Sequence, residues 1–276
     1  MSDNPQLHID IEAIIANKSP KLAKRVPKFV IKYLKKIEHI DEINEMLSLF
    51  GDTQGVEFAE NCLKYLNVEY RTHNIEKINR SGRYIIVSNH PLGGFDGMIL
   101  ITVLGKIFPQ IKFVVNDLLM NIKPLEPVFV PVNKLGKLSK LYAEQINSTY
   151  SSDAQILYFP AGLCSRLIKG NITDLEWKTN FLKKAIEYQR DIIPVFFSGR
   201  NSRFFYRLAK LRKLLKIKFN IEMMFLPNEL FKQKNRTFDI YFGEPIPINT
   251  ITKEKTLSEW TEFIRTKAYG ANNSTC

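Results

Sequence analysis

The chain has 276 residues, with 40 lysines and arginines against 28 aspartates and glutamates, a formal net charge of +12, and a hydrophobic fraction of 45%. This length suits one large domain or a core domain with a small appendage, and the apolar fraction supports a real hydrophobic core. The three cysteines are scattered and lack metal-ligand spacing, which excludes a disulfide framework and favours a reducing compartment.

No segment of the sequence indicates export or a membrane span. Residues 1–6 lack a basic region leading into an apolar one, so we predict no secretory signal. No apolar run approaches the roughly 18 residues needed to cross a bilayer. We therefore expect a protein that is either soluble or held at a membrane surface.

The first 70 residues are expected to be helical. Apolar residues recur at helical spacing near residues 8–16, 20–37, 39–50 and 55–66. Pro20 and Pro27 interrupt the second of these segments, so a continuous helix over 20–37 is unfavourable.

Positive charge is concentrated in two segments. Residues 21–36 contain seven basic and no acidic side chains, and residues 200–218 contain eight basic and no acidic ones. Bulky apolar residues alternate with the charges in both. This pattern predicts a basic amphipathic helix, which suits an anionic membrane surface. Nucleic acid attracts the same charge, and a solvated helix face shows the same pattern. Because no nucleic-acid-binding motif accompanies the charge, we favour a membrane surface.

From residue 84 onward, short apolar runs alternate with helical stretches. This alternation predicts an α/β fold with a mixed, largely parallel central sheet flanked by helices. Ligands usually bind such sheets where the strands end. The predicted strands are 84–88, 112–115, 128–132, 155–159, 192–197, 221–226 and 237–242, and the predicted helices are 94–106, 137–148 and 174–189.

The most informative motif, Asn-His-Pro-Leu-Gly-Gly-Phe-Asp, occupies residues 89–96 at the exit of the first predicted strand. His90 can move protons near neutral pH, and Asp96 can fix its tautomer. The glycines allow close approach of the backbone to a ligand, and N–H groups here could steady an oxyanion. The alternative is a structural histidine with a helix-capping aspartate. No serine or cysteine is marked as a nucleophile, which favours direct base catalysis over a covalent intermediate.

This motif resembles the His-X4-Asp signature block of the lysophospholipid/glycerolipid acyltransferase superfamily. Residues 158–166, Tyr-Phe-Pro-Ala-Gly-Leu-Cys-Ser-Arg, resemble its Phe-Pro-Glu-Gly-Thr-Arg block, with Ala161 in place of the acid and the arginine displaced to Arg166. Together with residues 174–177 and 193–202, the variant is similar to the hemolysin-like branch, which includes O-acyltransferases of ornithine- and glycine-containing aminolipids. The resemblance covers roughly residues 70–245.

The resemblance implies roles for particular residues. His90 would be the general base and Asp96 would orient it, so that an acceptor hydroxyl attacks the thioester of acyl-ACP or acyl-CoA without a metal or organic cofactor. Arg166 would contact an anion of the acceptor, unless it only forms a salt bridge. The family's second-block arginine is absent here, and Asn133 or Lys134 could substitute for it. The residues expected to bind substrate are Gly93, Gly94, Gly162, Ser165, Arg166 and Arg200.

These expectations combine into one functional hypothesis. Residues 1–70 are predicted to form a membrane-associating helical segment and residues 71–270 an acyltransferase domain. The expected partners are a lyso-lipid, an acyl-ACP or acyl-CoA thioester and an anionic membrane, with no nucleic acid or metal. The expected location is peripheral, on the cytoplasmic face of the cell (inner) membrane. The alternatives are a 1-acylglycerol-3-phosphate acyltransferase, a hydrolase that uses the same His-Asp pair, and a non-catalytic protein that binds anionic lipid.

Overall fold

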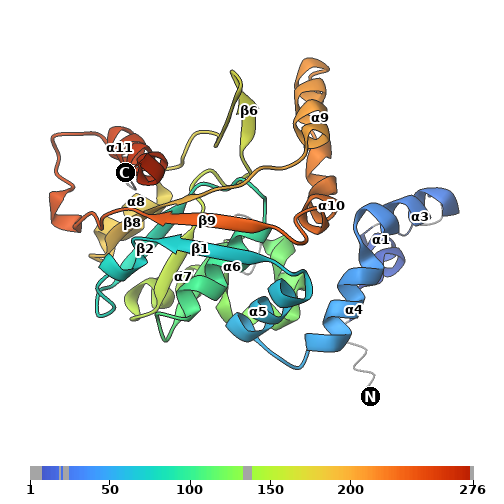
Figure 1. The fold of residues 1–276 in the computed structure, drawn as a ribbon, viewed down its shortest axis with the longest axis horizontal. Helices are drawn as coiled ribbons and strands as arrows, with labels where there is room; N and C mark the ends of the chain where they lie inside the picture. Colours follow the sequence, from blue (N-terminus) through green and yellow to red (C-terminus); the bar gives the residue numbers. More distant parts are fainter. Residues whose placement is uncertain (1–7, 19, 21–24, 133–138, 274–276) are drawn as a thin grey trace.

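The computed structural model describes residues 8–18, 20, 25–132 and 139–273, and its centre is a seven-stranded sheet of order β1-β9-β8-β2-β5-β3-β4 (Figure 1). Neighbouring strands are parallel except β8 and β9, which are antiparallel, so the predicted mixed, largely parallel sheet is confirmed. The strands are β1 Glu69–His73, β2 Tyr84–Ser88, β3 Ile111–Val115, β4 Phe129–Pro131, β5 Gln155–Tyr158, β8 Asp191–Phe197 and β9 Thr237–Phe242.

Helices cover both faces of the sheet, which explains why its central strand is apolar along its length. Successive side chains of β2 point to opposite faces: Ile86 packs into a core with α5 (Gly55–Tyr65) and α6 (Phe95–Gly105). Ile85 and Val87 pack into a second core with α8 (Asn180–Glu187) and α11 (Leu257–Gly270). The remaining α-helices are α1 Ile11–Lys18, α3 Lys28–Ile37, α4 Ile40–Phe50, α7 Ser139–Ser151, α9 Arg203–Leu214 and α10 Leu226–Phe231.

The N-terminal segment is helical, as predicted. Pro27 caps α3, so the basic segment does not form one helix over 20–37, and α3 has no buried residue among those described. Residues 21–24 of that segment lie outside the described residues. The predicted domain boundary between residues 70 and 71 falls inside β1, which pairs with β9 along its whole length.

Two of the predicted elements are wrong or too long. Residues 221–226 were expected to form a strand, but Ile221–Phe225 form a 3-10 helix that leads into α10. Pro227, in the first turn of α10, cannot donate to a strand ladder, and a short apolar run does not distinguish strand from helix. The helix predicted over 174–189 begins only at Asn180, because residues before it are held by side-chain contacts described below.

Three features of the fold are not predicted by the sequence pattern: β1, α11 and a short hairpin formed by β6 (Arg166–Ile168) and β7 (Asn171–Thr173). Strand β1 is an edge strand without a buried side chain, so it lacks the apolar signal used to find strands. The hairpin strands have three residues each and are joined by Lys169 and Gly170, both with positive φ, as expected for a tight two-residue turn.

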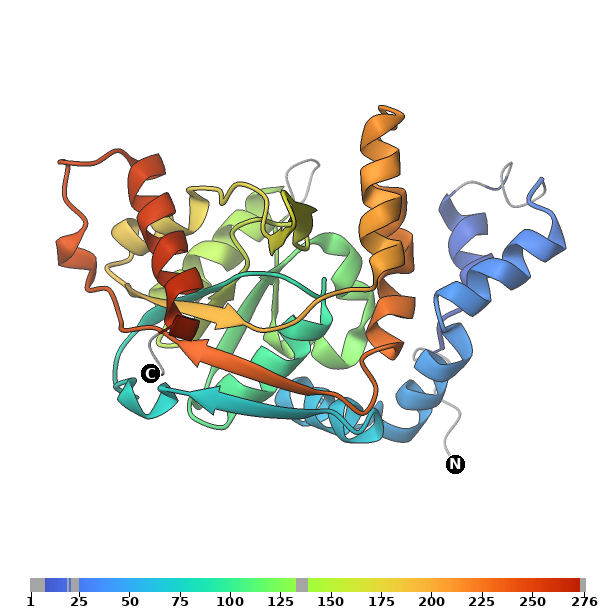
Figure 2. The ribbon, with the colours of Figure 1, turned by 45° about the horizontal axis from the view of Figure 1, so that its top comes forward.

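Helix α9 and the β6–β7 hairpin extend from the same side of the sheet, and α1 and α3 lie beyond α9 at one end of the molecule (Figure 2). The predicted helix in the second basic segment is confirmed by α9. No helix in the described parts of the chain is both long and apolar enough to cross a membrane.

Candidate active site

His90 lies just beyond β2, at the edge of the sheet where the parallel strands β8, β2 and β5 all end. Asn89 fixes this strand end, because its side-chain amide donates to the carbonyl of Phe197 (3.0 Å) and its Oδ1 accepts from the N–H of Phe197 (2.7 Å). The histidine is therefore attached to a hydrogen-bonded end of the central strand, at the edge where ligands bind in such sheets.

His90 and Asp96 form a hydrogen-bonded pair. Nδ1 of His90 lies 3.0 Å from Oδ2 of Asp96, which is fully buried in the first turn of α6. Five residues separate the two, so the expected His-X4-Asp spacing is wrong by one residue. Gly93 and Gly94 accommodate the longer connection, with φ of 74° and 136°, a region that L side chains rarely adopt.

Three backbone N–H groups complete the shell of Asp96. Leu92 donates to Oδ2 (2.9 Å), and Gly94 (3.1 Å) and Gly97 (2.9 Å) donate to Oδ1. The sequence suggested that N–H groups here could steady a substrate oxyanion. Instead, the N–H of Gly94 donates to Asp96 and is not directed at a substrate. Because Asp96 occupies Nδ1, the other ring nitrogen of His90, Nε2, is left for a substrate.

The pair is polarised electrostatically. Burial opposes the charged imidazolium, but the charge and hydrogen bond of Asp96, with the charge of Asp174, outweigh it and raise the pKa of His90. Burial would raise the pKa of Asp96, but His90 and the backbone N–H groups outweigh it, so that pKa is lowered. Asp96 therefore stays ionised and stabilises a proton on His90.

A second buried carboxylate, Asp174, holds the backbone around the histidine. Its Oδ1 accepts from the N–H of His90 (3.1 Å) and from Oγ of Ser165 (2.5 Å), and its Oδ2 accepts from Nε1 of Trp177 (2.8 Å). Burial raises the pKa of Asp174. Asp174 was not among the site residues predicted from the sequence, although the Asp-X-X-Trp spacing of residues 174–177 was a signal that could have indicated it.

The loop after β5 covers the histidine. Phe159 stacks on the His90 ring, with centroids 4.1 Å apart, and the N–H of Ser165 donates to the carbonyl of His90 (2.7 Å). Ser165 is thus brought to the site, but its hydroxyl is bound to Asp174. Gly162 turns this loop with a φ of 66°, and a Cβ there would meet only Nζ of Lys178, at 3.6 Å.

The predicted anion contact, Arg166, is buried and already paired. Its Nη2 lies 2.8 Å from Oε1 of Glu222, a fully buried residue, and its Nη1 donates to the carbonyl of Cys164 (2.6 Å). Nε of Arg212 on α9 lies 2.9 Å from the other oxygen of Glu222. A substrate anion would have to share Arg166 with this carboxylate.

The neighbouring cysteine, Cys164, is fully buried and is a poor nucleophile near neutral pH. Burial raises the pKa of the Cys164 thiol to about 11, so it is protonated near neutral pH. The chemistry available at the site is therefore that of a base, His90, acting on a hydroxyl or on water.

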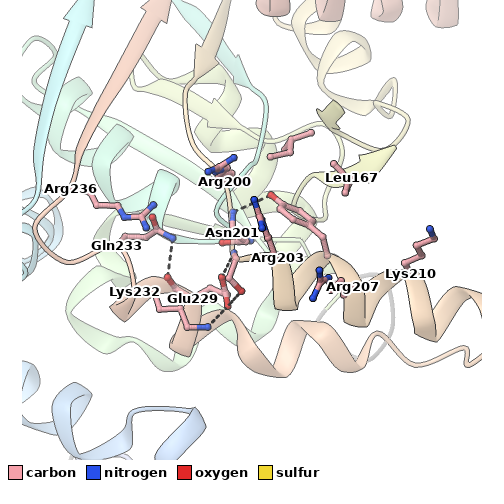
Figure 3. A pocket seen from close by; sticks show the side chains of 13 residues that line it. Leu167, Arg200, Asn201, Arg203, Arg207, Lys210, Glu229, Lys232, Gln233 and Arg236 are labelled. Carbon is pink, nitrogen blue, oxygen red and sulfur yellow. Dashed lines mark hydrogen bonds and ion pairs between the residues drawn. The ribbon is translucent and has the colours of Figure 1, made fainter. Parts of the chain in front are cut away.

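Arg200 follows β8 and lines a cavity of about 530 Å³ between α9, α10 and the β6–β7 hairpin (Figure 3). The cavity wall touches the site: Nδ2 of Asn201 donates to the carbonyl of Pro91, next to His90 (3.2 Å). Asn133 and Lys134, the predicted substitutes for the second-block arginine, lie outside the described residues.

Comparisons with known proteins agree on the kind of chemistry. A family model described as "Acyltransferase" matches residues 13–276. The lyso-glycine lipid O-acyltransferase of Bacteroides thetaiotaomicron is 47% identical over 270 residues, covering 98% of this chain and 99% of the relative. The enzyme of the same name from Phocaeicola vulgatus is 43% identical over 270 residues, covering 98% of this chain and 97% of the relative.

Among solved structures, the chain is similar to the 1-acyl-sn-glycerophosphate acyltransferase PlsC of Thermotoga maritima, with 16% sequence identity and a TM-score of 0.49. The match covers 89% of this chain and 88% of the other.

Proposed function

Because this chain belongs to the acyltransferase family across residues 13–276, we propose that it transfers a fatty acyl group to the hydroxyl of a lyso-glycine lipid. The membership confirms the resemblance drawn from the motifs at 89–96 and 158–166. Two relatives of nearly the same length, both named lyso-glycine lipid O-acyltransferases, favour this acceptor over 1-acylglycerol-3-phosphate. The observation that carries the mechanism is the buried His90–Asp96 pair at the carboxyl edge of the sheet.

The acyl transfer needs one base, and His90 supplies it. Nε2 of His90 removes the proton of the acceptor hydroxyl as its oxygen attacks the thioester carbonyl carbon. The carbon–sulfur bond then breaks, and the thiolate takes the proton back from His90, leaving an ester and a free thiol. Asp96 stabilises the imidazolium between the two transfers. No acyl-enzyme forms.

We also propose that no metal or organic cofactor takes part, since the proton and electron balance closes without one. The donor is an acyl-ACP or acyl-CoA thioester. Dialysis against a chelator is expected to leave the transfer rate unchanged. A rate that falls and returns on addition of a divalent cation would contradict this part of the proposal.

An anionic membrane surface supplies the acceptor in this proposal. Apolar side chains project into solvent from the two basic segments, including Phe29 on α3 (74% exposed) and Leu214 at the end of α9 (77%). Exposed apolar groups beside cations suit a bilayer interface, where both find partners. Because acyl-ACP and acyl-CoA are intracellular, we place the protein peripherally on the cytoplasmic face of the cell (inner) membrane.

The test is His90→Ala, compared with His8→Ala, the same change at an exposed histidine. With lyso-glycine lipid and acyl thioester, His90→Ala is expected to lose acyl transfer by about 10²–10⁴-fold and to sediment with anionic liposomes as before. If acyl transfer persists in His90→Ala, the assignment of His90 as the general base is wrong. Release of free fatty acid without transfer identifies a hydrolase, and liposome binding without turnover of any thioester identifies a lipid-binding protein.

A further inference from the structure

The cavity beside the active site carries more positive charge than the reaction at His90 requires. Among the described residues that line it, Glu229 is the one acid, and its carboxylate is buried and paired with Lys232 (2.7 Å). The other lining cations are exposed, and the described residues offer none of them an ion pair; they are Arg200, Arg203, Arg207, Lys210 and Arg236. Five unneutralised cations around one cavity indicate a ligand with concentrated negative charge.

Two buried amide side chains also line the cavity. Asn201 and Gln233 are both more than nine-tenths buried, and both line it. Their amide N–H groups are used: Asn201 donates to the carbonyl of Pro91 (3.2 Å) and Gln233 to the carbonyl of Glu229 (3.1 Å). These bonds fix the amide orientations and leave Oδ1 of Asn201 and Oε1 of Gln233 without a partner. Both oxygens are covered by neighbouring protein atoms, so they do not select a ligand, and the exposed cations carry that role.

The cavity lies beside the active-site segment, although His90 itself does not line it. Asn201 donates to the carbonyl of Pro91, directly after His90, and Leu167, which also lines the cavity, follows Arg166 in β6 (Figure 3). A ligand that extends past Asn201 would therefore place one end at His90 while its other end stays among the cations.

The volume, about 530 Å³, is that of a small-molecule site and is far more than one carboxylate fills. We propose that this cavity binds the phosphopantetheine arm of the acyl thioester donor. The arm carries a phosphate for the cations at one end and the thioester sulfur at the other. CoA and acyl carrier protein share this arm, and the assignment rests on the proposed acyl transfer.

Direct binding tests the cavity without any turnover. Isothermal titration of the full chain with 4′-phosphopantetheine is expected to show binding that weakens about tenfold or more when pantetheine, which lacks the phosphate, replaces it. Arg203→Gln/Arg207→Gln is expected to weaken phosphopantetheine binding by a similar factor. Lys183→Gln/Lys253→Gln, which removes equal charge from exposed positions outside the cavity, is expected to bind as the wild type. Equal affinity for the two probes, or wild-type affinity in the cavity variant, overturns the proposal.

Kinetics then distinguishes the donor from the acceptor and identifies the carrier. Arg203→Gln/Arg207→Gln should raise the KM for the phosphorylated donor about tenfold and leave kcat and the KM for lyso-glycine lipid nearly unchanged. Assays with acyl-CoA and with acyl-ACP, run in parallel, show which of the two thioesters is the donor. A raised KM for the lyso-lipid alone, or weakened liposome binding with an unchanged donor KM, overturns the proposal. Absence of transfer in the wild type contradicts the proposed function and leaves the titration as a separate test.

Discussion

The chemistry at His90 depends on two carboxylates that do different work. Asp96 touches the imidazole ring, whereas Asp174 touches the backbone N–H of the same residue and ties it to Ser165 and Trp177. Asp96 sets the charge state of the imidazole ring, and Asp174 fixes the position of the backbone that carries the ring. Either is expected to affect the rate, but only Asp96 also forms a hydrogen bond with the titrating group.

Substituting Asp96 by asparagine separates these effects through pH. His90 acts as a base only when neutral, and its raised pKa places the acid limb of kcat/KM above the value of about 6.5 for an ordinary histidine. Asp96→Asn removes the charge that raises this pKa, while burial continues to lower it. The limb should therefore move to lower pH, and kcat/KM at neutral pH should fall by about 10² or more. The measurement is kcat/KM from pH 5 to 9. An acid limb at the same pH in Asp96→Asn and in the wild type would show that Asp96 does not raise the pKa of His90.

For Arg166 the prediction concerns stability, because its charge is paired with Glu222 inside the protein. Arg166→Gln leaves the buried Glu222 with Arg212 alone and should cost about 3 kcal/mol of unfolding free energy, measured by urea denaturation. Replacing all three partners, as in Arg166→Met/Arg212→Met/Glu222→Met, should recover most of the loss, since no buried charge is then left without its partner. If Arg166→Gln is fully stable and only weakens acceptor binding, the contact expected from the sequence is the correct role.

The candidate site was predictable from sequence only where its parts are close in the chain. His90 and Asp96 stand within one glycine-containing segment after an apolar strand, so their meeting could be foreseen. The pairing of Arg166 with Glu222 joins residues 56 positions apart, and the contact between His90 and Asp174 spans 84. Such pairings depend on sheet order and loop paths, which periodicity does not encode.

At the scale of elements, α9 has two faces with different partners. Phe205, Tyr206 and Ala209 are buried against the body of the protein, whereas Leu214 and Leu215 at its end are exposed. The basic, apolar pattern predicted the helix, but it could not show that Arg212 belongs to the internal pair with Glu222 and that Lys210 lines the cavity. A test of membrane binding should therefore change the exposed apolar tip.

We expect Leu214→Ser/Leu215→Ser to weaken sedimentation with anionic liposomes by about tenfold or more, because each leucine loses its transfer into the interface. The fold should be unaffected, since both side chains are already exposed in solution. Ile186→Ser/Phe263→Ser is the control, because it removes two exposed apolar side chains from α8 and α11, outside both basic segments and outside residues 1–70. If Leu214→Ser/Leu215→Ser and the control bind liposomes equally well, the end of α9 does not contact the membrane.

At the scale of the whole molecule, the α/β class and six of the seven predicted strands could be read from local patterns. The order of strands in the sheet could not, because it depends on packing between segments far apart in the chain. Strand β1 shows why: it has no buried side chain of its own and is recognised only by its parallel pairing with β9. That pairing joins the N-terminal helices to the sheet.

The consequence is a prediction about where the chain can be shortened. Removing residues 1–37 deletes α1 and α3, and the described part of α3 buries no side chain, so thermal unfolding should remain cooperative while liposome binding weakens. Removing residues 1–70 also deletes α5, whose Phe58 and Leu63, like the following Leu66, are buried in the main core. At about 1.5–3 kcal/mol for each side chain, that loss matches the net stability of a typical domain, so no cooperative transition is expected. If the chain starting at residue 71 unfolds cooperatively and transfers acyl groups, residues 1–70 are a separate segment, as the sequence suggested.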